Sequence, residues 1–194
     1  MAPLDYYKKA WEQVQANLIA WVVLYTVFLV LSIGTCGLAG LLTPNLMREV
    51  RDSLRQGRGP SIGALFDMRH LSEDVVNYII WFGAISLGGM AGGIGGTVAA
   101  VALQFQMPLA ADGRYAPMDN AKLSLKHVGV HMGAHIVFFG IAMLISMVAV
   151  MLCLLPLPLI APVMNVAQWL WFEDSRAELD GMASQAGIKL LRAD

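Results

Sequence analysis

Charged residues are absent from three long stretches of the chain, and this absence constrains the fold more than any other feature. No Asp, Glu, Lys or Arg occurs in 13–47, 75–111 or 127–172, which are 35, 37 and 46 residues long. One helix needs about 20 apolar residues to cross the hydrocarbon core of a bilayer. Each stretch is therefore long enough for two helical passes, and the sequence predicts an all-α integral membrane protein.

The overall composition agrees with a membrane protein. Hydrophobic residues make up 57% of the chain and charged residues 14%, whereas about 25% of the residues in a soluble domain are charged. The net charge of -1 offers no basic field for a polyanion, so we expect no nucleic-acid partner. The two cysteines, Cys36 and Cys153, are too few for a disulfide scaffold or a four-ligand zinc site.

A Gly- or Pro-rich break interrupts each charge-free stretch, at 34–37, 92–96 and 156–158. Glycine frees the backbone and proline removes a hydrogen-bond donor, so both interrupt helices. We therefore expect three helical hairpins, with about six transmembrane or half-membrane helices in a single membrane domain. The expected segments are an interfacial helix at 1–16, hairpins at 17–47, 75–111 and 128–172, cytoplasmic loops at 48–74 and 112–127, and a polar tail at 173–194. Cys36 and Cys153 would both lie at hairpin tips, either paired there or buried as small apolar residues.

The basic residues support the hairpin arrangement. With three hairpins, all 13 Lys and Arg lie on one face of the membrane, whereas three single spans would divide them five against eight. Lys and Arg collect on the cytoplasmic side. We therefore expect a multi-pass protein of the bacterial inner membrane with both termini in the cytoplasm. The return legs are short, so they either span the bilayer or re-enter it.

The N-terminal segment has an amphipathic pattern. Its apolar side chains recur every three or four residues, at Leu4, Tyr7, Trp11, Val14 and Leu18. Lys8 and Lys9 lie off this stripe, and Trp11 suits the headgroup zone. We expect these three residues to contact lipid headgroups.

A second amphipathic helix is expected from the Thr43–Pro44 pair, a plausible cap and first helical residue, to Gly57. On this helix Arg48, Arg51 and Arg55 share one face. They would meet anionic headgroups, or else pair with the acidic residues of the same helix.

Three histidines recur at four-residue spacing in the third stretch: His127, His131 and His135. On a straight helix they share one face, but the first and third lie about 12 Å apart and cannot bind the same ion. We expect a polar contact between helices, without a metal or any other cofactor. These three histidines are nevertheless the candidate ligands if a metal binds.

Small residues form a ladder at four-residue steps through the second stretch: Ala84, Gly88, Gly92, Gly96 and Ala100. Such residues allow helix backbones to approach closely in lipid. The partner would be another helix of this chain or a second copy, and the short legs favour a homo-oligomer.

The segment 59–63 has the pattern Gly-x-Ser-x-Gly. A nucleophile elbow needs a strand before the serine, but here a helix is expected, so we interpret Ser61 as a helix cap and expect no enzymatic activity. Histidine is the only residue type within the expected spans whose usual pKa lies near neutral pH or that carries a full charge there, which disfavours proton-coupled transport. The favoured function is a non-enzymatic scaffold or assembly module that contacts membrane lipids. The alternative is a channel, transporter or lipid-handling protein, which a pocket lined by His131, His135, Asn165 and Gln168 would favour.

The order of these features resembles a group of bacterial six-span membrane proteins. The matching stretches are 8–11, 42–44 leading to 55–57, 61–67, 108–112 and 119–125. They are similar to the proteins described as glycerophosphoryl diester phosphodiesterase membrane-domain-like and to families of uncharacterised function. In the phosphodiesterases a separate soluble domain carries the catalysis, so the resemblance implies a membrane module without that activity.

Overall fold

The computed structural model describes residues 2–35, 37–90, 92–152 and 156–191, and these contain helices and no strand. The predicted all-α class is confirmed. The helices are α1 (Pro3–Gln15), α2 (Leu18–Gly34), η1 (Leu38–Leu42), α3 (Thr43–Gln56), η2 (Ile62–Phe66), α4 (Leu71–Met90), α5 (Gly93–Ala102), α6 (Gln106–Asp112), α7 (Pro117–Val130), α8 (Met132–Met151) and α9 (Leu157–Gln185). Cys36 and Cys153 lie outside the described residues.

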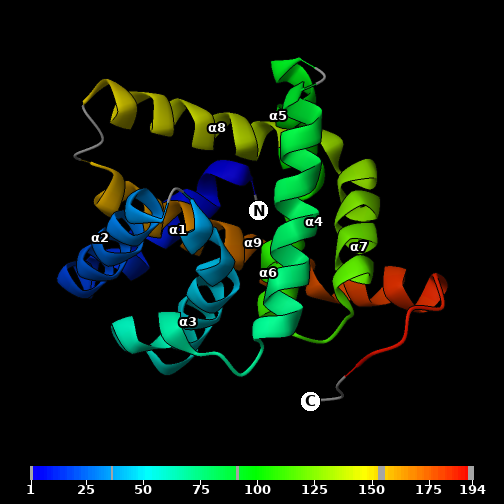
Figure 1. Ribbon diagram of the computed structural model, residues 1–194, viewed down its shortest axis with the longest axis horizontal. Helices are drawn as coiled ribbons and strands as arrows, with labels where there is room; N and C mark the ends of the chain where they lie inside the picture. Colours follow the sequence, from blue (N-terminus) through cyan, green and yellow to red (C-terminus); the bar gives the residue numbers. More distant parts are fainter. Residues whose placement is uncertain (1, 36, 91, 153–155, 192–194) are drawn as a thin grey trace.

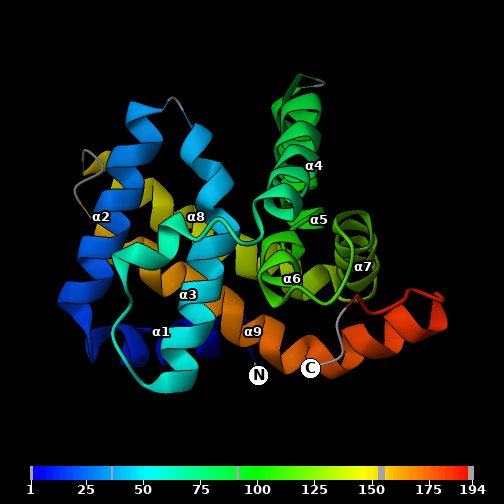
Figure 2. The ribbon, with the colours of Figure 1, turned by 60° about the horizontal axis from the view of Figure 1, so that its bottom comes forward.

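Helix α9 is the central element of the fold, and it contacts α1, α2, α3, α6, α7 and α8 (Figure 2). The segment from residue 173, expected to be a polar and weakly helical tail, is part of α9, which continues without a break to Gln185. Its apolar face continues as well, with Phe172, Leu179 and Met182 all buried. Burial of that face against its neighbours keeps the segment helical despite its many charged residues.

Helix α1 packs against α9 and α8. Of its expected apolar stripe, Tyr7 and Val14 are buried, whereas Leu4 is 51% and Trp11 43% exposed. The helix ends at Gln15 and the chain bends by 102° into α2, so Leu18 does not extend the stripe. One side of α1 therefore faces protein, and the side that carries Trp11 remains open.

Prolines mark the starts of two helices: the Thr43–Pro44 pair predicts the first, and the Ala116–Pro117 pair predicts by the same argument a short amphipathic helix through Lys126. Helix α3 begins at Thr43 with Pro44 in its first turn, and α7 begins at Pro117 with Ala116 as its cap. Thr43 itself is not the cap, because η1 leads directly into α3 and the Thr43 N–H bonds to the Gly40 carbonyl. Helix α7 also continues past Lys126 to Val130.

The long helices do not form an up-and-down bundle. The C-terminal ends of α2 and α4 point to the same side of the molecule (Figure 2), whereas α8 runs across the α4/α5 hairpin (Figure 1). Among the described residues, two segments are long and apolar enough to cross a membrane, Gly93–Asp112 and Met132–Ala149, and α1 with α2 makes a third if that bent pair counts as one span. These two or three segments support membrane association, and the predicted six spans are not confirmed.

Candidate functional site

A break in the helix brings two of the three histidines together. Helix α7 ends at Val130, and His131 leaves the helical region with φ -114° and ψ 32° before α8 begins. As a result, His127 Nδ1 lies 2.9 Å from His135 Nε2. The expected separation of these two residues was wrong, because it assumed a straight helix through all three histidines.

The third histidine points to α9. His131 Nε2 lies 2.7 Å from Glu178 Oε1, and His127 Nε2 lies 3.8 Å from Glu178 Oε2. Glu178 was missed in the sequence because it falls in the segment that was expected to be a polar tail. The helical spacing of the apolar residues Phe172, Leu179 and Met182 was the available signal that the helix continues past residue 173.

Aromatic rings enclose the buried part of this cluster. His127 is 1% exposed and His135 is fully buried. The Phe105 ring lies 4.9 Å from the His127 ring, and the Trp171 ring lies 4.3 Å from the His135 ring. Burial, together with the nearby His131, lowers the pKa of His127 to about 4, so this ring is uncharged at neutral pH.

The exposed part of the cluster opens into a cleft of about 420 Å³. Asp174 and Ser175 of α9 line the cleft beside Glu178, and Tyr6 of α1 donates a 3.0 Å hydrogen bond to Asp174. The imidazoles of His127 and His131 and the carboxylate of Glu178 therefore meet at a solvent-accessible surface. Asp174 and Ser175 add further oxygen atoms about one helical turn from Glu178. We call His127, His131, His135 and Glu178 the histidine cluster.

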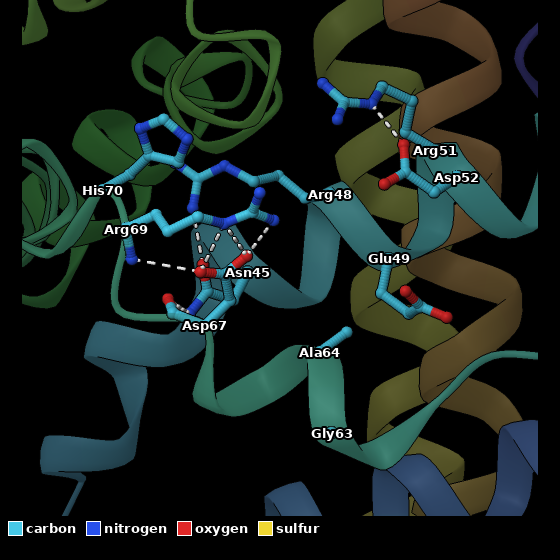
Figure 3. A pocket seen from close by; sticks show the side chains of 10 residues that line it. All are labelled: Asn45, Arg48, Glu49, Arg51, Asp52, Gly63, Ala64, Asp67, Arg69 and His70. Carbon is cyan, nitrogen blue, oxygen red and sulfur yellow. Dashed lines mark hydrogen bonds and ion pairs between the residues drawn. The ribbon is translucent and has the colours of Figure 1, made fainter.

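A second polar site is a pocket of about 540 Å³ formed by α3, the η2 segment and the loop before α4 (Figure 3). Arg48 lies on one wall, where its guanidinium pairs with both carboxylate oxygens of Asp74 at 2.7 and 2.6 Å and donates to Asn45 at 2.5 Å. Asn45 in turn donates to the carbonyls of Leu65 and Asp67. This network ties α3 to the start of α4, and Arg48 is not available to lipid headgroups.

The other arginines of this pocket are also paired. Arg51 bonds to Asp52 and to the Ala111 carbonyl, and Arg69 pairs with Asp67 (Figure 3). Arg55, outside the pocket, pairs with Glu173 of α9. The expected basic face of α3 therefore joins α3 to α6 and α9, whereas Lys8, Lys9 and Trp11 are exposed on α1; headgroup contact by these three residues stays a prediction.

The glycine ladder lies between two helices of the same chain. A Cβ on Gly88 would lie 2.5 Å from the Gly95 carbonyl oxygen, and one on Gly96 would lie 3.1 Å from the Ile85 carbonyl oxygen. Gly92 has no neighbour for a Cβ and lies in the turn with φ +102°. The ladder is therefore not continuous, because the chain folds back at Gly92. Gly88 packs against α5, and Gly96 packs against α4.

Ser61 lies in a loop between two helices and does not follow a strand. It follows α3 and precedes η2, and its backbone N–H donates to Glu49 Oε1 at 2.6 Å. Glu49 is 3% exposed and also pairs with Arg58. The Gly-x-Ser-x-Gly segment is thus a loop held to α3 by one carboxylate.

A third cavity, of about 340 Å³, lies beneath α8 and combines apolar and amide side chains. Its polar residues include Gln104, Asn165 and Gln168, and its apolar lining includes Trp81 and Phe138. It contains two of the four residues that the sequence associated with a transported or bound substrate, and neither His131 nor His135 lines it.

No protein family model matches the chain, and no curated protein and no solved structure matches it.

Proposed function

We propose that this protein is a non-enzymatic integral membrane module that serves in scaffolding or assembly within the bacterial inner membrane. The observation that carries the proposal is the apolar surface of α8: only 17% of Met132–Ala149 is buried by the rest of the protein. Lipid, or a partner's apolar helix, would cover this surface in a membrane.

The topology that we propose is multi-pass with both termini in the cytoplasm. The C-terminal ends of α2 and α4 point away from α9 and the charged segments around it (Figure 2), which supports hairpins that enter the membrane from one side. Most of the return legs are short, as half-membrane segments would be, so six full spans are not part of the proposal. The similarity to the six-span bacterial group stays a prediction.

Cysteine labelling tests this topology in a variant with Cys36 and Cys153 replaced by serine. Single cysteines at the exposed positions Gln56, Met118 and Ser184 should be protected from an impermeant reagent in intact cells. A cysteine at Met90, which is 85% exposed at the end of α4, should react. Labelling at Met118 from outside would contradict the hairpin arrangement.

A scaffold needs partners, and we propose membrane lipids together with a second copy or another membrane protein. Because Gly88 and Gly96 pack inside the chain, assembly would use another surface. Cross-linking in membranes followed by native mass spectrometry should give an oligomer or a defined complex, and a protein that remains an isolated monomer would contradict the scaffold role.

The cavity lined by Gln104, Asn165 and Gln168 favours a second candidate function, the handling of a lipid. An apolar chamber with a few amides suits an acyl chain and its ester or hydroxyl group. Ala142 lines this cavity, so Ala142→Phe should displace a co-purified lipid in native mass spectrometry. Val148→Phe, on the exposed surface of α8, is the matched control.

A further inference from the structure

We propose that His127, His131 and Glu178 form a binding site for a divalent transition-metal ion, with Zn²⁺ the best match. Their ligand atoms all lie within 4.8 Å of one another. Two imidazole nitrogens and one carboxylate oxygen are a ligand set that zinc uses in sites with an open position. Both histidines are among the candidate ligands named from the sequence, and the fold adds the carboxylate, which the spacing of the histidines could not indicate.

The separations of the ligand atoms are close to those of a coordinated ion. Zinc ligands at about 2.0–2.2 Å from the metal lie about 3.3 Å from one another in a tetrahedron. The distances from the Glu178 oxygens, 2.7 Å to His131 Nε2 and 3.8 Å to His127 Nε2, lie on either side of that value. His131 and Glu178 are 40% and 43% exposed, so both side chains have room for the small adjustment.

Hydrogen bonds behind the site fix which nitrogen of His127 carries a proton. Gln104 Oε1 can only accept, so His135 Nδ1, 2.9 Å away, must donate to it. An uncharged imidazole has one N–H, so His135 Nε2 is an acceptor and receives the N–H of His127 Nδ1. When the His127 ring is also uncharged, its Nε2 is therefore left with a lone pair.

That lone pair faces Glu178 Oε2, which is also an acceptor. His127 Nε2 belongs to a side chain that is only 2% exposed, and two acceptors that face each other without a hydrogen between them repel. A cation between them would satisfy both groups. This arrangement is the independent reason to place a metal here rather than an ordinary hydrogen bond.

The same hydrogen bonds provide the outer shell that a metal site needs. A metal-bound imidazole normally gives its other N–H to an acceptor, which fixes the ring orientation. Here that acceptor is His135, which Gln104 holds in turn, and Gln168 of α9 donates to the Gln104 backbone carbonyl. The buried half of the site is thus organised before an ion arrives.

The open side of the site faces the cleft lined by Asp174 and Ser175. A water molecule, or Asp174 after release from Tyr6, would complete four ligands. The ion would join the α7/α8 junction to α9, so its expected effect is to stabilise the fold by mass action. Because His131 donates to Glu178 without metal, binding would move that proton to Nδ1 or release it.

The test uses the full chain in detergent micelles, without a polyhistidine tag and freed of metal with a chelator. We expect Zn²⁺ titration calorimetry and elemental analysis to give one ion per chain, and Zn²⁺ to raise the unfolding temperature. Glu178→Ala and His131→Ala should weaken binding by at least about tenfold, whereas His70→Ala, outside the site, should leave it unchanged. The metal-free variants should unfold at the wild-type temperature, since both side chains are partly exposed.

A second variant tests the hydrogen-bond relay itself. Gln104→Leu keeps all three ligands but removes the acceptor that orients His135, and should weaken Zn²⁺ binding by about ten- to a hundredfold. Folded wild-type protein that takes up no stoichiometric Zn²⁺ would overturn the proposal. Equal binding by wild type and Glu178→Ala would overturn it as well.

Discussion

Gly88 of α4 and Gly95 of α5 lie in direct backbone contact: a Cβ atom on Gly88 would lie 2.5 Å from the Gly95 carbonyl oxygen. Real Cβ atoms do not approach a carbonyl so closely, so the two helices can pack this way only through glycine. The stability of the α4/α5 hairpin therefore depends on having glycine at these positions.

Gly88→Ala should therefore destabilise the protein by about 1–3 kcal/mol, because the methyl group forces the helices apart. Gly83 lies on the same helix with open space around its Cβ position. Gly83→Ala should be neutral or stabilise the protein by up to about 1 kcal/mol through helix propensity. Reversible unfolding in detergent measures both, and equal effects would mean that α4 and α5 are not in contact.

Asp74→Ala should destabilise the protein by about 3–5 kcal/mol, because it leaves the Arg48 guanidinium without its partner in a largely buried site. Asp74 is 2% and Arg48 13% exposed. The matched pair is Arg69 and Asp67 in the same pocket, where Arg69 is 82% exposed. Arg69→Ala should leave the free energy of unfolding unchanged within experimental error.

Leu179→Ala should cost about 2–5 kcal/mol, since the side chain is 1% exposed and its loss leaves a cavity beside α9. Leu190→Ala, at a position 51% exposed, should change stability by no more than about 0.5 kcal/mol. Chemical unfolding curves compare the two. A small effect at Leu179 would mean that this part of α9 does not pack against the rest of the protein, as expected for a polar tail.

Glu49→Ala should expose the loop after α3 to trypsin at Arg58. Glu49 accepts hydrogen bonds from Arg58, Ser61 N–H and Ser53. Loss of these hydrogen bonds, each about 0.5–1.5 kcal/mol, should speed cleavage by at least about tenfold through local opening. Asp52→Ala, which removes a partner of Arg51 alone, should not; timed proteolysis analysed by mass spectrometry distinguishes them.

The features predicted correctly from the sequence are those that depend on neighbouring residues alone, namely helix starts and apolar helices. The prolines at 44 and 117 mark the first turns of α3 and α7 because a fixed φ and a missing donor suit that position. The charge-free stretches predicted apolar helices, and in the part of the chain that the structure describes two or three segments meet the requirement for a span. Those inferences needed no knowledge of which helices meet.

The candidate site depended on information that no local pattern holds. His131 interrupts a helix that periodicity alone would continue, and the interruption lets His127 reach His135. Glu178 joins the histidines from α9, 47 residues beyond His131. The arginines of α3 show the same limit: a basic face predicts charge at a surface, but the partners Asp74, Ala111 and Glu173 come from α4, α6 and α9.

The central position of α9 has a consequence for biosynthesis. Helix α9 is translated after every helix that it contacts, and Tyr6 bonds to Asp174 across 168 residues of chain. Until the ribosome has released that segment, α1, α3 and α7 lack the surface against which they pack. If the protein is the membrane module proposed above, its earlier apolar segments enter the bilayer before α9 is available. Completion of the fold would then follow insertion, and a nascent chain stalled before α9 would present its unfinished interior to chaperones and proteases.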